Sequence, residues 1–215
     1  MKPALAVVIP TVGRATLVRT LDSLDGRAER DLLEVFVVAD THGGLTSDLE
    51  QARDHVRSER DSAVFHWREY DAGLHCWGHP QRMLGGRSAT APFVWYTQDD
   101  NAAAEGAATA ILGAIAHQAH ARPLFFRWLS PWRETIWRDQ RLLLGNIDAD
   151  CLVLPKRVAQ QVTWGLRYEG DFDAAVYAMR IADGEVDWQD TVISIARPDS
   201  TLCWWEHRVS DGAPV

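Results

Sequence analysis

The chain has 215 residues, of which 47% are hydrophobic and 24% are charged, a balance that excludes a disordered or fibrous protein. Asp and Glu number 30 against 22 Lys and Arg, so the formal net charge of −8 excludes binding of nucleic acid through overall positive charge. Three scattered cysteines, Cys76, Cys151 and Cys203, favour a reducing compartment over a disulfide framework. No apolar run reaches the roughly 20 residues of a membrane span, and no secretory signal is recognised, so we expect a cytoplasmic protein.

Hydrophobic patterning alternates between strand and helix without a linker, which predicts a single domain over residues 1–215. Apolar runs predict strands at residues 4–9, 33–39, 64–67, 92–97 and 124–128. Helical spacing, a capping-box pair at Ser47 and Glu50, and an Ala-rich segment predict helices at residues 17–24, 47–60, 102–120 and 174–181. The predicted fold is α/β, with a mainly parallel sheet flanked by helices and a ligand site beyond the carboxyl ends of the strands.

Polar residues follow the first two predicted strands. The first strand continues into Pro10, Thr11, Gly13 and Arg14, without the glycine pattern of a P-loop or a dinucleotide site. A turn leading into a helix explains these residues equally well. The second strand ends in Asp40, which can accept an N–H from a base or cap its own turn.

Two adjacent carboxylates, Asp99 and Asp100, follow the fourth predicted strand. Neighbouring carboxylates repel each other unless a cation or hydrogen bonds compensate them. Mg²⁺ and Mn²⁺ are held by one or two such carboxylates together with substrate phosphates. The alternative is a helix N-cap with an acidic first turn, which the helix dipole favours.

Two candidates for chemistry lie in the C-terminal half. Asp171 precedes a predicted helix, where it can act as a general base or as the N-cap of that helix. His207 is a candidate metal ligand, although an isolated histidine is more often an ordinary surface or core residue.

Residues 121–141 contain five arginines against two carboxylates, with Trp128, Trp132 and Trp137 interleaved. This pattern suits a partner with phosphates and flat rings, such as single-stranded or base-flipped nucleic acid, and it also suits a sugar or a pyrophosphate-linked lipid. A strand pair with aromatic core residues and a solvated arginine face is the alternative.

Together these segments resemble the family 2 glycosyltransferases, which have the GT-A fold. Residues 8–14 are similar to the family's opening "VIPTYNR" segment, and residues 37–40 resemble its "VVDD" strand, whose acidic end contacts the nucleobase. Gln81-Arg82-Met83 falls where the family has "ARN", which implies that Arg82 faces the nucleotide. Gln98-Asp99-Asp100 occupies the position of the DxD motif, and Gly170-Asp171 that of "ED". The sequence departs from the motifs at Val12, Met83, Gln98 and Gly170.

The resemblance implies an inverting transfer of sugar from a nucleotide sugar, with a UDP-sugar as the expected donor and Mn²⁺ or Mg²⁺ as the cation. Asp100, with Asp99 and a C-terminal histidine at His207, would hold the metal, and Asp171 would be the catalytic base. The acceptor carries a hydroxyl, and a hydroxylated base in nucleic acid is one candidate.

Two other classes of protein stay open. One is a non-catalytic module that binds a sugar nucleotide or nucleic acid on the same scaffold. The other is a nucleotidyltransferase, although the Gly-rich phosphate loop that it needs is absent.

Overall fold

The structure is a computed structural model that describes residues 2–24, 30–42, 44–58, 65–71, 76–132 and 134–198. Its strands are β1 (Leu5–Thr11), β2 (Leu33–Asp40), β3 (Phe65–Tyr70), β4 (Phe93–Tyr96), β5 (Asn101–Ala103), β6 (Leu124–Leu129), β7 (Thr135–Ile136), β8 (Leu152–Pro155) and β9 (Asp187–Ala196). Its α-helices are α1 (Thr16–Ser23), α2 (Ser47–Ser58), α3 (His79–Ser88), α4 (Ala107–Ala116), α5 (Lys156–Ala159) and α6 (Gly170–Ile181). Short 3₁₀ helices are η1 (Arg30–Leu32) and η2 (Ala149–Cys151). None of the helices in the described ranges combines the length and apolar character that a membrane span requires.

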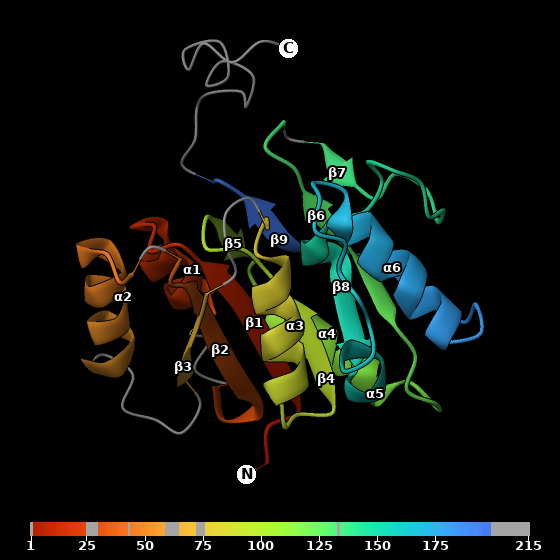
Figure 1. Cartoon of the computed structure of the whole chain (residues 1–215). Coiled ribbons are helices and arrows are strands. Elements are labelled where there is room, and N and C mark those ends of the chain that lie inside the picture. The colour runs from red at the N-terminus through yellow and green to blue at the C-terminus, as the bar shows by residue number, and fades with distance from the viewer. Residues whose placement is uncertain are drawn as a thin grey trace.

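The strands form one mixed sheet in the order β3-β2-β1-β4-β8-β6-β9-β5, with β7 paired to β6 (Figure 1). The block β3-β2-β1-β4 is parallel, as is the pair β6–β9, whereas β8 runs antiparallel to both of its neighbours. In the parallel block Leu5 pairs with Leu33 and Thr11 with Ala39, so β1 and β2 end at the same edge of the sheet. The predicted α/β fold is confirmed, and its parallel block ends where the polar segments begin.

The sheet is covered on both faces, which explains its continuous apolar runs. Because side chains alternate along a strand, Val8 and Val38 face one core, which α3, α5 and α6 complete. Val7 and Val37 face the other core, to which α1, α2 and α4 contribute Leu17, Leu21, Val56 and Ile111. In Figure 1, α3 accordingly crosses the front of the sheet while α4 lies behind it.

The predicted start of the Ala-rich helix and the predicted capping residue of the helix at 47–60 are wrong. The Ala-rich helix begins at Ala107 because Asn101–Ala103 instead pairs with β9 as strand β5. Asp99 and Asp100 therefore lie in a loop between two strands, and the N-cap explanation for them is wrong. Helix α2 is capped by Thr46 and not by Ser47, since the amide of Leu49 donates to Oγ1 of Thr46 at 3.2 Å.

The sequence analysis missed α3, β8 and β9. Helix α3 contains Gly85 and Gly86, which disfavour helix formation, but both are needed for close packing. A Cβ on Gly85 would lie 2.4 Å from Cγ1 of Val8, and one on Gly86 would lie 2.5 Å from the hydroxyl oxygen of Tyr96. The glycines thus let α3 press onto β1 and β4, which sets the position of Arg82 above the sheet.

Candidate functional site

A cavity of about 550 Å³ opens beyond the carboxyl ends of β1, β2 and β4, within the size range of small-molecule sites. It gathers residues that the sequence places far apart, and eight of the predicted site residues line it: Pro10, Thr11, Arg14, Asp40, Arg82, Asp99, Asp100 and Asp171. Gly13 lies in the adjoining loop, and His207 lies outside the described residues.

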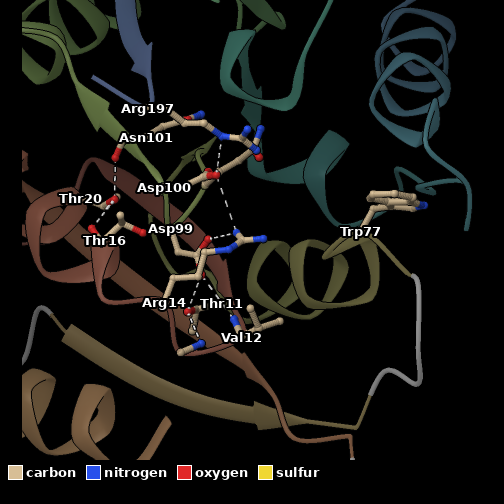
Figure 2. Close-up of polar contacts among 12 residues, drawn as sticks. Thr11, Val12, Arg14, Thr16, Thr20, Trp77, Asp99, Asp100, Asn101 and Arg197 are labelled. Atoms are coloured by element: carbon tan, nitrogen blue, oxygen red, sulfur yellow. Dashed lines mark hydrogen bonds and ion pairs between the residues drawn. The ribbon is translucent and has the colours of Figure 1, made fainter. Parts of the chain in front are cut away.

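Asp99 is buried at the base of this cavity and is tied to the loop after β1 (Figure 2). Its Oδ2 accepts a hydrogen bond from the Thr11 hydroxyl at 2.7 Å, and its Oδ1 accepts one from Nη1 of Arg14 at 2.5 Å. Burial raises the pKa of Asp99, and the charge of Arg14 and the Thr11 hydrogen bond act in the opposite direction. Asp99 thus fixes Arg14 at the cavity wall.

Asp100 lies beside Asp99 and is compensated by a second arginine, as Figure 2 shows. Nε of Arg197 donates to its Oδ2 at 2.9 Å, and Nη1 of Arg14 lies 3.9 Å from the same oxygen. One guanidinium, that of Arg14, therefore serves both carboxylates. The sequence analysis missed Arg197, which directly follows β9; the alternating pattern of that strand is the signal that locates it.

The loops after β1 and β2 complete this side of the cavity. Gly13 has a φ of 88°, and a Cβ there would lie 2.9 Å from the amide nitrogen of Leu49, so glycine lets the loop pack on the start of α2. Its amide donates to Oγ1 of Thr11 at 2.9 Å. Asp40 accepts from the amide of His42 at 3.0 Å and also lines the cavity, so its role as a turn cap and its exposure to a ligand coexist.

The loop that carries Asp99 and Asp100 is held by a fully buried carboxylate that the sequence analysis missed, Asp150. Each of its oxygens accepts two hydrogen bonds, at 2.5–3.1 Å. The donors come from the end of β4, the following loop and β9: Thr97, Gln98, Asn101 and Ser194. Because four separate donors converge on one side chain, the geometry of the loop depends on Asp150.

Asp171 lies on the opposite wall, in the first turn of α6, where Glu169 and not Asp171 occupies the N-cap. Its side chain is 19% exposed, and its buried Oδ1 has no hydrogen-bond partner and lies 3.7 Å from Nδ1 of His79. Burial raises the pKa of Asp171, while Arg82 opposes that shift. A partly desolvated carboxylate with an unpaired oxygen at a cavity wall suits a general base.

Arg82 is buried between the two walls and is positioned by His79. Nε2 of His79 lies 3.0 Å from the carbonyl of Arg167, so Nδ1 is the ring atom that accepts from Nη1 of Arg82 at 3.3 Å. Burial and the charge of Arg82 lower the pKa of His79 to about 3, which keeps the ring neutral. A Cβ on Gly170 would lie 2.4 Å from this Nε2, so the contact with His79 requires glycine at this position.

A further carboxylate, Asp148, lines the cavity close to Asp171 and was also missed. Its Oδ1 accepts hydrogen bonds from the side-chain amide of Gln98 at 3.2 Å and from the backbone amide of Asp150 at 3.0 Å. Burial and repulsion by Asp171 raise the pKa of Asp148 well above its usual value. Gln98 therefore links the acidic loop after β4 to the carboxylates on the other wall.

The arginine- and tryptophan-rich segment at 121–141 gives no support to a nucleic-acid surface. Trp128 and Trp137 are buried in the core, and Arg127 lies over the Trp137 ring at 4.6 Å. Arg133 lies outside the described residues. The other arginines of this segment pair with carboxylates. The pairs are Arg122–Glu185, Arg127–Asp190, Arg138–Glu134 and Arg141–Asp139. The structure thus favours the alternative of aromatic core residues with a solvated arginine face.

No protein-family model and no curated protein match the chain. Solved structures do: S. aureus TarS has a TM-score of 0.68 at 13% identity over 90% of this chain. A fragment of TarS comprising residues 1–349 in complex with UDP-GlcNAc has a TM-score of 0.68 at 15% identity over 99% of it. The mannosyltransferase PcManGT from Pyrobaculum calidifontis, in complex with GDP-Man and Mn²⁺, has a TM-score of 0.66 at 18% identity over 98% of it.

The chain spans 36% of the length of TarS, 62% of the TarS fragment and 61% of the mannosyltransferase. At these identities the likeness concerns the path of the backbone, and it extends over nearly the whole of this chain. The chain has the GT-A fold that these glycosyltransferases share.

Proposed function

We propose that the chain is an inverting glycosyltransferase of the family 2 type that takes its sugar from a nucleotide sugar, with UDP as the nucleotide. One observation carries this proposal. In a GT-A fold, a single cavity brings an acidic loop with two arginines against a carboxylate of raised pKa, Asp171. The complexes of the similar structures with UDP, UDP-GlcNAc and GDP-Man support a nucleotide-sugar donor.

In this proposal the nucleotide lies along the ends of β1 and β2. Asp40 accepts an N–H from the base, and Pro10 and Thr11 contact the nucleoside. Arg14 and Arg82 face the diphosphate, where a guanidinium provides two parallel donors to phosphate oxygens. Gly13 shapes the loop after β1, which carries Thr11 and Arg14.

The charge of the cavity favours a divalent cation with the donor. The carboxylates that line it outnumber the arginines that do so, the former being Asp40, Asp99, Asp100, Asp148, Glu169 and Asp171 and the latter Arg14, Arg82 and Arg197. A diphosphate would add negative charge to this surface, so a cation must accompany it.

The side chains fit a cation held mainly by the donor. Among the described residues no three His, Cys, Asp or Glu side chains form a ligand cluster, but Mg²⁺ needs only one or two carboxylates when phosphates supply the rest. Both oxygens of Asp99 are engaged by Thr11 and Arg14, which leaves Asp100 as the main protein ligand, with His207 as a further one. Bound Mn²⁺ or Mg²⁺ would offset charge on the leaving diphosphate.

Asp171 supplies the base in this proposal. The acceptor oxygen attacks the anomeric carbon from the face opposite the diphosphate, and its proton passes to the Asp171 carboxylate. The bond between the anomeric carbon and the phosphate oxygen breaks, and the electron pair leaves with the nucleoside diphosphate. One displacement of this kind inverts the anomeric centre.

Donor binding tests the proposal directly. UDP at about a hundred times its Kd adds roughly 2.7 kcal/mol to the stability of the protein, which a thermal shift detects. We expect a shift that depends on Mn²⁺ and is lost in Asp100→Asn, but kept in the control Asp54→Asn, whose carboxylate is exposed on α2. A shift with GDP alone would change the assigned nucleobase from uracil to guanine. The proposal would be contradicted if neither a nucleoside diphosphate nor a sugar nucleotide gave a shift. Donor binding without hydrolysis or transfer would favour the non-catalytic module.

The pH profile of transfer should reflect the raised pKa of Asp171. The base must be ionised, so kcat/KM is expected to fall with decreasing pH at a point above the ordinary Asp value of about 3.9. Burial is the main cause of this pKa shift, Arg82 opposes it, and repulsion by Asp150 adds to it. For folding, a raised carboxyl pKa contributes stability below the unfolded-state pKa that is lost as pH rises through the folded-state pKa. A decrease in kcat/KM that begins only at or below the ordinary Asp value would contradict the raised pKa of Asp171 as the base.

A further inference from the structure

Three exposed aromatic side chains, Trp77, Trp132 and Tyr168, line the cavity, and Trp77 and Tyr168 contact each other. Trp77 is 52% exposed and Tyr168 is 59% exposed, and both line the cavity. Their rings meet edge to face, with centroids 5.4 Å apart and planes at 80°. In Figure 2 the Trp77 indole projects from the start of α3, apart from the carboxylate–arginine cluster. Exposed indole is costly in water, so a tryptophan held in this way indicates a binding surface.

The backbone holds Trp77 in this position. Its φ of 53° lies in the left-handed region, which residues other than glycine rarely adopt. Its carbonyl accepts a hydrogen bond from Nη1 of buried Arg82 at 2.7 Å. At Gly78, the next residue, φ is 77° and a Cβ would lie 2.8 Å from Cβ of Pro10. Strained backbone retained by buried contacts clusters at functional sites.

Tyr168 connects this surface to the proposed base. It lies three residues before Asp171, directly ahead of α6, whereas Trp77 lies directly ahead of α3. The pair therefore bridges the starts of the two helices that carry Asp171 and Arg82. Trp77, Tyr168 and Asp171 all line the cavity, so a ring placed on the pair would lie in the cavity that holds the proposed base.

We propose that Trp77 and Tyr168 form the acceptor subsite and that the acceptor is a neutral carbohydrate, an inference that rests on the proposed function. The C–H face of a pyranose carries partial positive charge, which complements the negative face of an aromatic ring. The carboxylates on this side, Asp148, Glu169 and Asp171, accept hydrogen bonds from sugar hydroxyls and repel phosphate-bearing acceptors such as nucleic acid or a lipid pyrophosphate.

The test measures acceptor use separately from donor use. The probes are methyl glycosides of neutral hexoses and N-acetylhexosamines, a hexose 6-phosphate, and a single-stranded oligonucleotide. In Trp77→Ala and in Tyr168→Ala we expect the acceptor KM for neutral glycosides to rise by about 10-fold or more while the Kd for UDP stays within error. Trp77→Phe keeps a ring face and should recover most of the loss. Tyr177→Ala removes an exposed aromatic of α6 outside the cavity and serves as the control.

The outcomes separate this inference from the proposed function. Failure of the wild type to bind any nucleoside diphosphate, or to hydrolyse any sugar nucleotide, would overturn both. Donor hydrolysis together with an unchanged glycoside KM in Trp77→Ala would overturn the subsite alone. Preference for the phosphorylated sugar or the oligonucleotide, or the absence of glycoside binding by saturation-transfer NMR while donor hydrolysis proceeds, would overturn the neutral carbohydrate.

Discussion

The Asp171→Asn variant is expected to bind UDP as the wild type does and to lose transfer by about 10²- to 10⁴-fold, the usual contribution of a positioned general base. Its side chain lines the cavity and its buried Oδ1 has no hydrogen-bond partner, so the amide keeps the shape of the side chain but cannot take a proton. Because burial already raises the pKa of this carboxyl, a neutral amide should not destabilise the fold. Steady-state kinetics with a sugar nucleotide and UDP titration of the same sample measure both quantities.

Asp173→Asn is the matched control for this variant. Asp173 lies in the same turn of α6, but its carboxylate pairs with Arg167 at 2.7 Å and does not line the cavity. Transfer by Asp173→Asn is therefore expected to stay close to that of the wild type. Full activity of Asp171→Asn, or an equal loss in both variants, would contradict the assignment of Asp171 as the base.

Asp150→Ala is expected to lower the free energy of unfolding by about 3 kcal/mol or more, because buried donors left without an acceptor each cost about 1–3 kcal/mol. Four donors converge on this carboxylate, two from hydroxyls and two from side-chain amides. Urea unfolding followed by tryptophan fluorescence measures the change.

Asp150→Asn removes the charge of the side chain but keeps its volume and one acceptor oxygen. Its amide can donate to Thr97 and Ser194, whose hydroxyls can turn to accept, while its oxygen keeps the bonds from Gln98 and Asn101. We therefore expect a smaller loss of stability than in Asp150→Ala. Equal stability of Asp150→Ala and the wild type would show that the loop carrying Asp99 and Asp100 does not depend on this contact.

Local sequence signals predicted the N-terminal half of the sheet and the near wall of the site. Buried parallel strands read as continuous apolar runs, and their carboxyl ends meet at one edge, so residues after β1, β2 and β4 could be placed together. The prediction failed where tertiary contacts outweigh local preference. Gly85 and Gly86 weaken the helical signal of α3 because space against Val8 and Tyr96 requires them, and residues 101–103 leave the Ala-rich helix to pair with β9.

Three side chains of the site could not be predicted from spacing. Asp148, Asp150 and Arg197 carry no motif, and their roles come from long-range contacts with the loop after β4. In residues 121–141 the local excess of arginine suggested a basic surface, but the carboxylates that balance Arg122 and Arg127 follow some 60 residues later. The net charge counted along residues 121–141 therefore overestimated the positive charge of the surface that these residues form. The single domain over 1–215 and the cytoplasmic location stay predictions.

The guanidinium shared by Asp99 and Asp100 makes these two residues and Arg14 one electrostatic unit. Replacing either aspartate frees Arg14 to move toward the other. The remaining aspartate then loses its neighbouring carboxylate and also has a different contact with Arg14. Single substitutions will then report on the rearranged pair, and their effects will not add. Any attempt to alter the cation or donor preference of this loop has to vary the three side chains together.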